Sequence, residues 1–137
     1  MAHLLPPIVS PLSRVTTQNN IAENYLGNAL SIYEELQDPE GIGETLSLLA
    51  PLAETEGRIE MAEELYQKSV IQYRIGQLGR HIADSLLRLG RFLIERRGKQ
   101  DEGCLTISEA IQRYADMRLP NEQEARDIAR QLGCSGK

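Results

Sequence analysis

The chain has 137 residues, the size of one ordinary domain, and its 41% hydrophobic and 26% charged residues are typical of a folded protein. The net charge of −5 disfavours binding to a phosphate backbone. The low aromatic content of 4% argues against an aromatic β core and against stacking platforms for single-stranded nucleic acid. No segment approaches the roughly 18 apolar residues of a membrane span. We therefore expect neither a nucleic-acid nor a membrane partner.

The N-terminal segment, residues 1–17, contains Pro6, Pro7 and Pro11 and is predicted to be irregular or flexible. It lacks the basic region of a signal peptide, and its short apolar run is interrupted by these prolines. We therefore expect a cytoplasmic protein whose folded domain covers residues 18–137.

The rest of the chain has the periodicity of helices. Apolar residues recur at intervals of three and four, and no stretch shows the alternation typical of a strand. Helices are predicted over residues 18–36, 41–56, 59–75, 80–97, 100–117 and 121–132. The predicted fold class is all-α.

Glycine and proline mark the ends and one irregularity of these helices. Gly57 and Gly98 are expected to end helices. Pro51 falls inside the second helix, where it removes a hydrogen bond to Ser47. Either a kink is tolerated there, or the proline reshapes a groove.

The last helix has its own signals for both ends. Asn121 with Glu124 predicts an N-terminal capping box, and Gly133 predicts the C-terminal end.

The helices form an internal repeat. Tyr33, Tyr73 and Tyr114 are 40 and 41 residues apart, and a small residue precedes each by four positions. The segments between them also correspond: Leu46, Leu49 and Ala50 match Leu86, Leu89 and Gly90. The chain therefore contains two alternating kinds of helix, in about two and a half units plus a terminal capping helix.

One unit contains Leu46, Leu49, Ala50, Gly57, Ala62, Tyr66 and Ser69. This pattern resembles the tetratricopeptide repeat (TPR). The period near 41 exceeds the usual 34 and is similar to the long-period repeats of bacterial ATP-driven transcriptional regulators and kinesin light chains. The resemblance implies a right-handed solenoid of helical hairpins whose small residues lie where the helices cross. It also implies a protein–protein interaction module whose first helices line a concave groove for a peptide or helix.

The resemblance places eight residues in that groove: Glu44, Ser47, Glu54, Asp84, Leu87, Arg91, Ile94 and Glu95. A clamp for a terminal carboxylate is not supported, because Glu, Ser and Asp occupy the corresponding places. A basic or apolar peptide would fit this groove. The alternative is a solvated helix surface with ion pairs Asp84–Arg88 and Arg91–Glu95.

The first predicted helix has no preceding helix to pack against. Its apolar residues Leu26, Leu30, Ile32, Tyr33 and Leu36 would gain about 1.5–3 kcal/mol each on full burial. Of these, Leu26, Leu30, Tyr33 and Leu36 are the candidates for self-association. Three coverings are open: the N-terminal segment, a second copy in a homodimer, or upstream protein that this chain lacks. We expect self-association or a fragment.

Charge differs between the two halves of the chain. Residues 1–67 carry a net charge of −9 and residues 68–137 a net charge of +4. In an elongated stack this dipole could steer a partner.

No catalytic or metal motif is recognisable. Cys104 and Cys134 are 30 residues apart, and His3 and His81 do not complete the short paired spacings of a zinc site. We favour two free thiols over a disulfide, although the spacing allows one. Neither a nucleophile–base motif nor a phosphate-binding loop occurs, so we expect no enzyme activity and no cofactor.

The predicted function is an adaptor or scaffold. The alternative is a regulatory or sensor segment of a larger ATP-dependent signalling or transcription-regulating protein.

Overall fold

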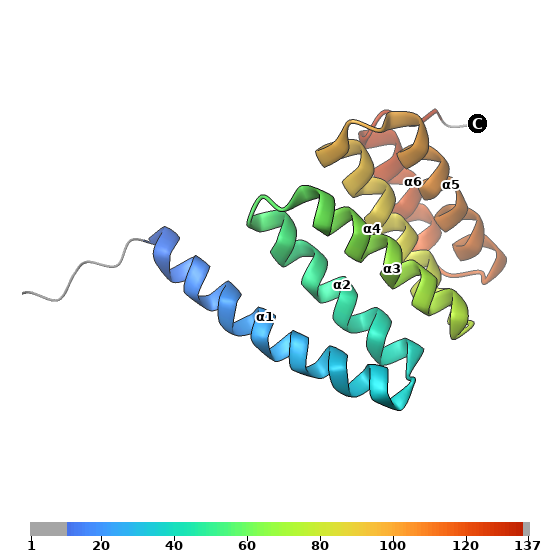
Figure 1. The fold of residues 1–137 in the computed structure, drawn as a ribbon. Helices are drawn as coiled ribbons and strands as arrows, with labels where there is room; N and C mark the ends of the chain where they lie inside the picture. Colours follow the sequence, from blue (N-terminus) through green and yellow to red (C-terminus); the bar gives the residue numbers. More distant parts are fainter. Residues whose placement is uncertain (1–10, 136–137) are drawn as a thin grey trace, which may run out of the picture.

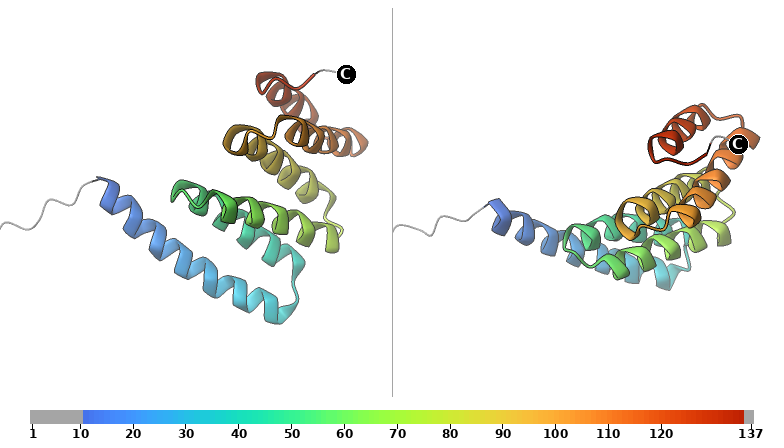
Figure 2. Two further views of the ribbon diagram at one scale, coloured as in Figure 1. Left: turned by 45° about the horizontal axis from the view of Figure 1, so that its top comes forward. Right: turned by 90° about the horizontal axis from the view of Figure 1, so that it is seen from above.

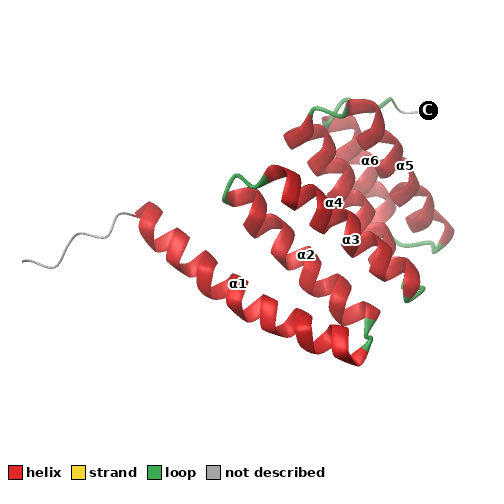
Figure 3. Ribbon diagram, in the orientation of Figure 1, coloured by secondary structure: helices red, strands yellow, loops and turns green. Residues whose placement is uncertain are grey.

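The computed structural model describes residues 11–135, with side chains from residue 18 onward, and this part of the chain contains six α-helices and no strand. The helices are α1 (Pro11–Leu36), α2 (Pro39–Thr55), α3 (Ile59–Ile75), α4 (Gly79–Arg97), α5 (Gln100–Asp116) and α6 (Asn121–Gln131). Figure 3 shows that only short connections separate them. The predicted all-α class is confirmed. None of the described helices is long and apolar enough to cross a membrane.

Consecutive helices pack against each other in chain order. The pairs α2–α3 and α4–α5 pack most extensively and form two helical hairpins. Helix α6 adds to α5 at one end of the stack, and α1 adds to α2 at the other. Helix α1 lies beside α2 near the turn that joins them and diverges from it toward its own N-terminus (Figures 1 and 2).

The first helix begins at Pro11, seven residues before the predicted start, so the irregular segment predicted over residues 1–17 is wrong for residues 11–17. Proline suits the first turn of a helix, because its fixed φ is helical and its missing N–H would have had no partner there. Pro6 and Pro7 lie outside the described residues.

The repeat extends to the turns after the tyrosine-bearing helices. Gln37, Gln77 and Arg118, each four residues after a repeat tyrosine, have positive φ angles of 52°, 55° and 55°. In each turn the next residue donates its N–H to the carbonyl of that tyrosine: Asp38 to Tyr33, Leu78 to Tyr73 and Leu119 to Tyr114, at 2.9–3.0 Å. The same turn therefore closes α1, α3 and α5, the alternate helices of the chain.

The remaining helix ends follow the sequence prediction with one exception. Gly57, Gly98 and Gly133 have φ angles of +79°, +65° and +81°, which glycine adopts without strain. The exception is α6, where Pro120 occupies the capping position and no side chain caps the helix. The predicted capping box is wrong, because Asn121 is already the first helical residue.

Small residues occupy equivalent buried positions in the two hairpins. In the first, Ala50 and Ala62, which correspond to Gly90 and Gly103 at spacings of 40 and 41 residues, are fully buried. In the second, a methyl group added to Gly90 would lie 2.8 Å from the Gly103 carbonyl oxygen, and one added to Gly103 would lie 2.7 Å from the Gly90 oxygen. Helices α4 and α5 therefore touch backbone to backbone.

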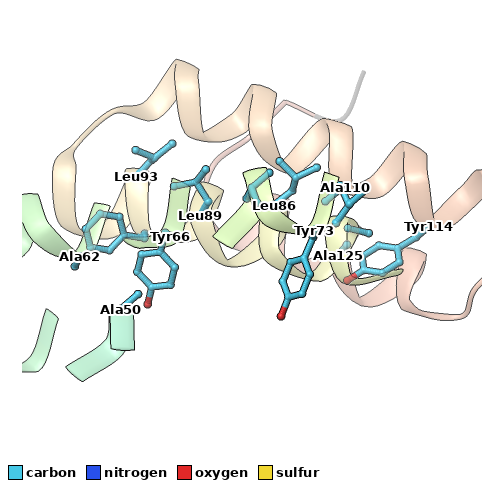
Figure 4. Packing of buried hydrophobic residues seen from close by; sticks show 14 of the residues in the cluster. Ala50, Ala62, Tyr66, Tyr73, Leu86, Leu89, Leu93, Ala110, Tyr114 and Ala125 are labelled. Carbon is cyan, nitrogen blue, oxygen red and sulfur yellow. The ribbon is translucent and has the colours of Figure 1, made fainter. Parts of the chain in front are cut away.

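The buried core runs along the stack between the hairpins (Figure 4). Tyr66 and Tyr73 of α3 and Tyr114 of α5 pack among the leucines of α4, and the ring centroids of Tyr66 and Phe92 are 5.0 Å apart. Tyr25 does not belong to this set. Tyr25 is exposed. The residue 40 positions before the buried Tyr66 is Leu26, so Leu26 and not Tyr25 occupies the equivalent position of the repeat.

The two cysteines form a disulfide, so the expectation of free thiols is wrong. Helix α6 folds back along α5 and buries Ala125 and Ala129. Cys134, which follows Gly133, is thereby brought beside Cys104, with 5.5 Å between their Cα atoms. The amide of Gln100 donates to the Leu132 carbonyl oxygen at 2.8 Å and holds the same junction.

We predict that Gly90→Ala destabilises the protein by about 1–3 kcal/mol, because the methyl group must separate two touching backbones. Gly27→Ala, inside α1, is the matched control. A Cβ there meets nothing within 4 Å, so alanine should add about 0.5–1 kcal/mol through helix propensity. Urea unfolding followed by circular dichroism measures both changes. Equal effects of the two substitutions would contradict the close crossing.

We predict that the double variant Cys104→Ser/Cys134→Ser loses about 3–4 kcal/mol, the chain-entropy value for a loop of 30 residues. The α6 amides should lose hydrogen-exchange protection first, because the bond holds α6 on α5. The α3 amides serve as the internal control. Unchanged α6 protection would show that packing alone docks the helix.

Candidate functional site

The first helices of the two hairpins share one surface, the α2/α4 face, which contains two adjoining hollows. The first, of about 290 Å³, is lined by Glu44, Ser47, Leu48, Tyr73, His81, Asp84, Ser85 and Arg88. The second, of about 210 Å³, is lined by Glu54, Tyr66, Arg88, Arg91, Phe92, Glu95 and Arg96. Arg88 lines both hollows, so the two form one continuous surface.

The structure brings six of the eight predicted groove residues to this face: Glu44, Ser47, Glu54, Asp84, Arg91 and Glu95. The other two lie elsewhere. Leu87 is partly buried against the hydrophobic core, and Ile94 packs against Gly103 of α5. Pro51 is exposed, and α2 continues through it.

Tyrosines of the second helices reach across to carboxylates of the first. The Tyr66 hydroxyl donates to Glu54 Oε1 at 3.1 Å, and the Tyr114 hydroxyl donates to the Asp84 carboxylate. Burial raises the pKa of both phenols well above its usual range, and the acceptor carboxylates raise it further. These two tyrosines therefore stay protonated and hold Glu54 and Asp84 in place.

Several other charges on this face are paired within the chain. The predicted Arg91–Glu95 pair is present at 2.5 Å, and Arg96 pairs with Glu54 at 3.4 Å. The predicted Asp84–Arg88 pair does not form, because Asp84 accepts the hydrogen bond of Tyr114 instead.

His81 also has partners on this face. Its Nε2 lies 3.4 Å from Glu40 Oε1, and its ring meets the Tyr73 ring edge-on at 5.0 Å between centroids. Its position is therefore fixed from two sides.

In the first hollow of the α2/α4 face, two opposite charges have no ion-pair partner among the described side chains. Glu44 and Arg88 are both exposed, and neither forms an ion pair with any side chain described from residue 18 to residue 135. The positive charge of Arg88 acts on the phenols of Tyr66 and Tyr73, where it opposes the effect of burial on their pKa. A carboxylate and a guanidinium thus lie beside buried tyrosines and are available to a ligand.

Sequence reasoning missed part of this surface. Tyr66 and Tyr73 were interpreted only as repeat markers, and Arg88 was not placed among the groove residues. Counting helical positions could have placed Arg88 three residues before Arg91 on the same face of α4. The reach of the tyrosine hydroxyls depends on how α3 and α5 pack, which no local pattern specifies.

Two larger hollows lie elsewhere in the fold. One, of about 590 Å³, is lined by residues of α1, α2 and α3, among them Leu30, Ile42 and Lys68. The other, of about 560 Å³, lies between α5 and α6 beside the disulfide. The α2/α4 face is the stronger candidate, because buried side chains of the second helices position its polar groups. Within the described residues, no cluster of three or more His, Cys, Asp or Glu could hold a metal ion.

The predicted self-association residues do not share one surface. Leu26, Leu30 and Tyr33 are partly buried, and the Tyr33 ring packs against Gly41 of α2. Leu36 is exposed. Helix α2 therefore already covers most of this set.

Comparisons of the chain with protein-family models, with curated protein sequences and with solved structures gave no match.

We predict that the phenols of Tyr66, Tyr73 and Tyr114 ionise only as the protein unfolds. Their folded-state pKa is raised, so the stability that they contribute is complete below the unfolded value of about 10 and is lost as the pH rises through the folded value. Tyrosinate absorbance from these residues should therefore rise together with the loss of helical circular dichroism. Tyr114→Phe should weaken this alkaline dependence. Ionisation of all five tyrosines with intact helices would contradict the prediction.

Proposed function

We propose that the chain is a non-catalytic protein–protein interaction module, an adaptor or scaffold that binds a peptide or helix of a partner through the α2/α4 face. The observation that carries this proposal is the pair of unpaired opposite charges, Glu44 and Arg88, in a hollow whose other polar groups are largely held by contacts within the chain.

The proposal includes a TPR-like solenoid of the long-period type. Its support is the recurrence of one turn at Gln37, Gln77 and Arg118 and the buried small residues at equivalent positions of both hairpins. A repeat stack presents its first helices side by side, and such surfaces suit extended or helical ligands.

The chemistry of the face suggests what the ligand carries. Glu44 would form an ion pair with a basic side chain of the ligand, and Arg88 would donate hydrogen bonds to a carboxylate or a backbone carbonyl of the ligand. Leu48 is half-exposed on the same hollow and would contact an apolar side chain. We therefore propose an amphipathic segment with a basic residue as the ligand.

We predict that Glu44→Lys and Arg88→Glu each abolish capture of the partner, because each reverses a charge that meets the ligand. Glu60→Lys and Lys68→Glu on α3 are the matched controls and should leave capture unchanged. A pull-down followed by calorimetry with the captured segment measures the loss. Equal binding by all four variants would exclude the α2/α4 face.

The alternative function is a regulatory or sensor segment of a larger ATP-dependent signalling or transcription-regulating protein. The observation that favours it is the apolar surface of α1, which no described part of the chain covers. An ATP-binding domain encoded immediately upstream would support this alternative, whereas a free-standing reading frame would support the adaptor.

The cytoplasmic location is also a proposal. It requires that the Cys104–Cys134 bond of the structure be reduced in the cell, which makes it testable. In a reducing cytoplasm the two thiols would be kept reduced and would react with a maleimide in intact cells. An oxidising compartment would keep them bonded and unreactive. Unreactive thiols would therefore overturn the proposed location.

A further inference from the structure

Helix α1 carries two apolar surfaces, and only one of them faces α2. The second consists of Ile21, Tyr25, Ile32 and Leu36, which are 58%, 78%, 56% and 68% exposed. At 3.6 residues per turn these four residues fall within an arc of about 60°. We call this set the α1 stripe. Large exposed apolar surfaces of this kind mark sites of interaction.

The repeat itself does not require such residues. The equivalent positions at and after α3, 40 residues further along, are Met61, Leu65, Gln72 and the capping residue Gly76. Those of α5, another 41 residues along, are Glu102, Thr106, Arg113 and the capping residue Met117. Each of those helices has polar residues or glycine at two or more of the four positions. Among these three helices, only α1 has four large apolar residues there.

The α1 stripe is complementary to itself in one arrangement. If two copies lie antiparallel, residue i meets residue 57 − i, so Ile21 meets Leu36 and Tyr25 meets Ile32. The centre of this register falls between Asn28 and Ala29. Every large apolar side chain of one copy therefore meets a large apolar side chain of the other, which is what an isologous two-fold interface requires.

The charges of α1 allow this approach. The α1 stripe contains no charged residue. Glu23 and Glu34 lie roughly opposite to it around the helix, at about 170–190° from its centre. Glu35 lies at its flank, about 70° from the centre, and in the antiparallel register it falls at the level of Ala22 of the second copy. Two negatively charged copies can therefore meet along the stripe without placing carboxylates against each other.

We propose that the α1 stripe is a homodimer interface, in which α1 of two copies pair antiparallel about a two-fold axis near Asn28 and Ala29. The occupant of the stripe is a second copy of this chain. The interface lies on α1 rather than on the α2/α4 face, so it does not depend on the proposed peptide-binding function.

The first test is the mass in solution, by sedimentation equilibrium of the full chain over a range of concentrations. We expect a concentration-dependent rise from 15.3 kDa to twice that mass. Ile32→Glu should raise the dimer dissociation constant at least about tenfold, because it buries a charge against Tyr25 of the second copy. Ile71→Glu, at a similarly exposed isoleucine of α3 outside the stripe, should leave it unchanged. Circular dichroism checks that both variants remain folded.

The second test fixes the orientation. In the antiparallel register, the two copies of Asn28 lie beside the axis, whereas the two copies of Gln18 are about 31 Å apart along the pair. Asn28→Cys should therefore form an intermolecular disulfide on oxidation, and Gln18→Cys should not. Cross-linking of both would indicate a parallel pair and overturn the proposed register. A monomer at every concentration, or equal effects of Ile32→Glu and Ile71→Glu, would overturn the homodimer and leave a different partner as the occupant.

Discussion

The backbone contact between paired helices is the constraint on which the rest of the structure depends. At Gly90 and Gly103 the two helices of a hairpin meet with no side chain between them, and the equivalent positions of the other hairpin hold the fully buried Ala50 and Ala62. Helices this close leave room for large side chains only on either side of the crossing. The tyrosines of the second helices occupy that space, and the leucines of α4 pack between them.

The polar character of the α2/α4 face follows from this packing. A tyrosine ring that is buried between helices carries its hydroxyl to the edge of the core, where it needs an acceptor. Glu54 and Asp84 provide the acceptors, so two of the acidic groups on this face are structural. Glu44 and Arg88 accept no such hydrogen bond and form no ion pair with the described side chains. They are therefore the charged groups of this face that a ligand could contact, whereas Glu54 and Asp84 stabilise the fold.

The two ends of the stack are built differently. Helix α6 buries only alanines deeply, is polar on its outer side and is fixed to α5 by the disulfide, as suits a terminal capping helix. Helix α1 instead presents the α1 stripe to its surroundings. One end is thus closed by the chain itself, whereas the other end retains an apolar surface that a second copy would bury.

The sequence by itself determined the helices, their all-α class and the repeat, because apolar periodicity and small residues at fixed spacing are local patterns. Most helix ends were predicted to within two residues, and six of eight candidate groove residues lie on one face. Only the tertiary structure decided which residues far apart in the chain meet. The Cys104–Cys134 bond depends on the return of α6 along α5. The division of α1 into a covered and an uncovered surface depends on the direction from which α2 approaches, which periodicity does not encode.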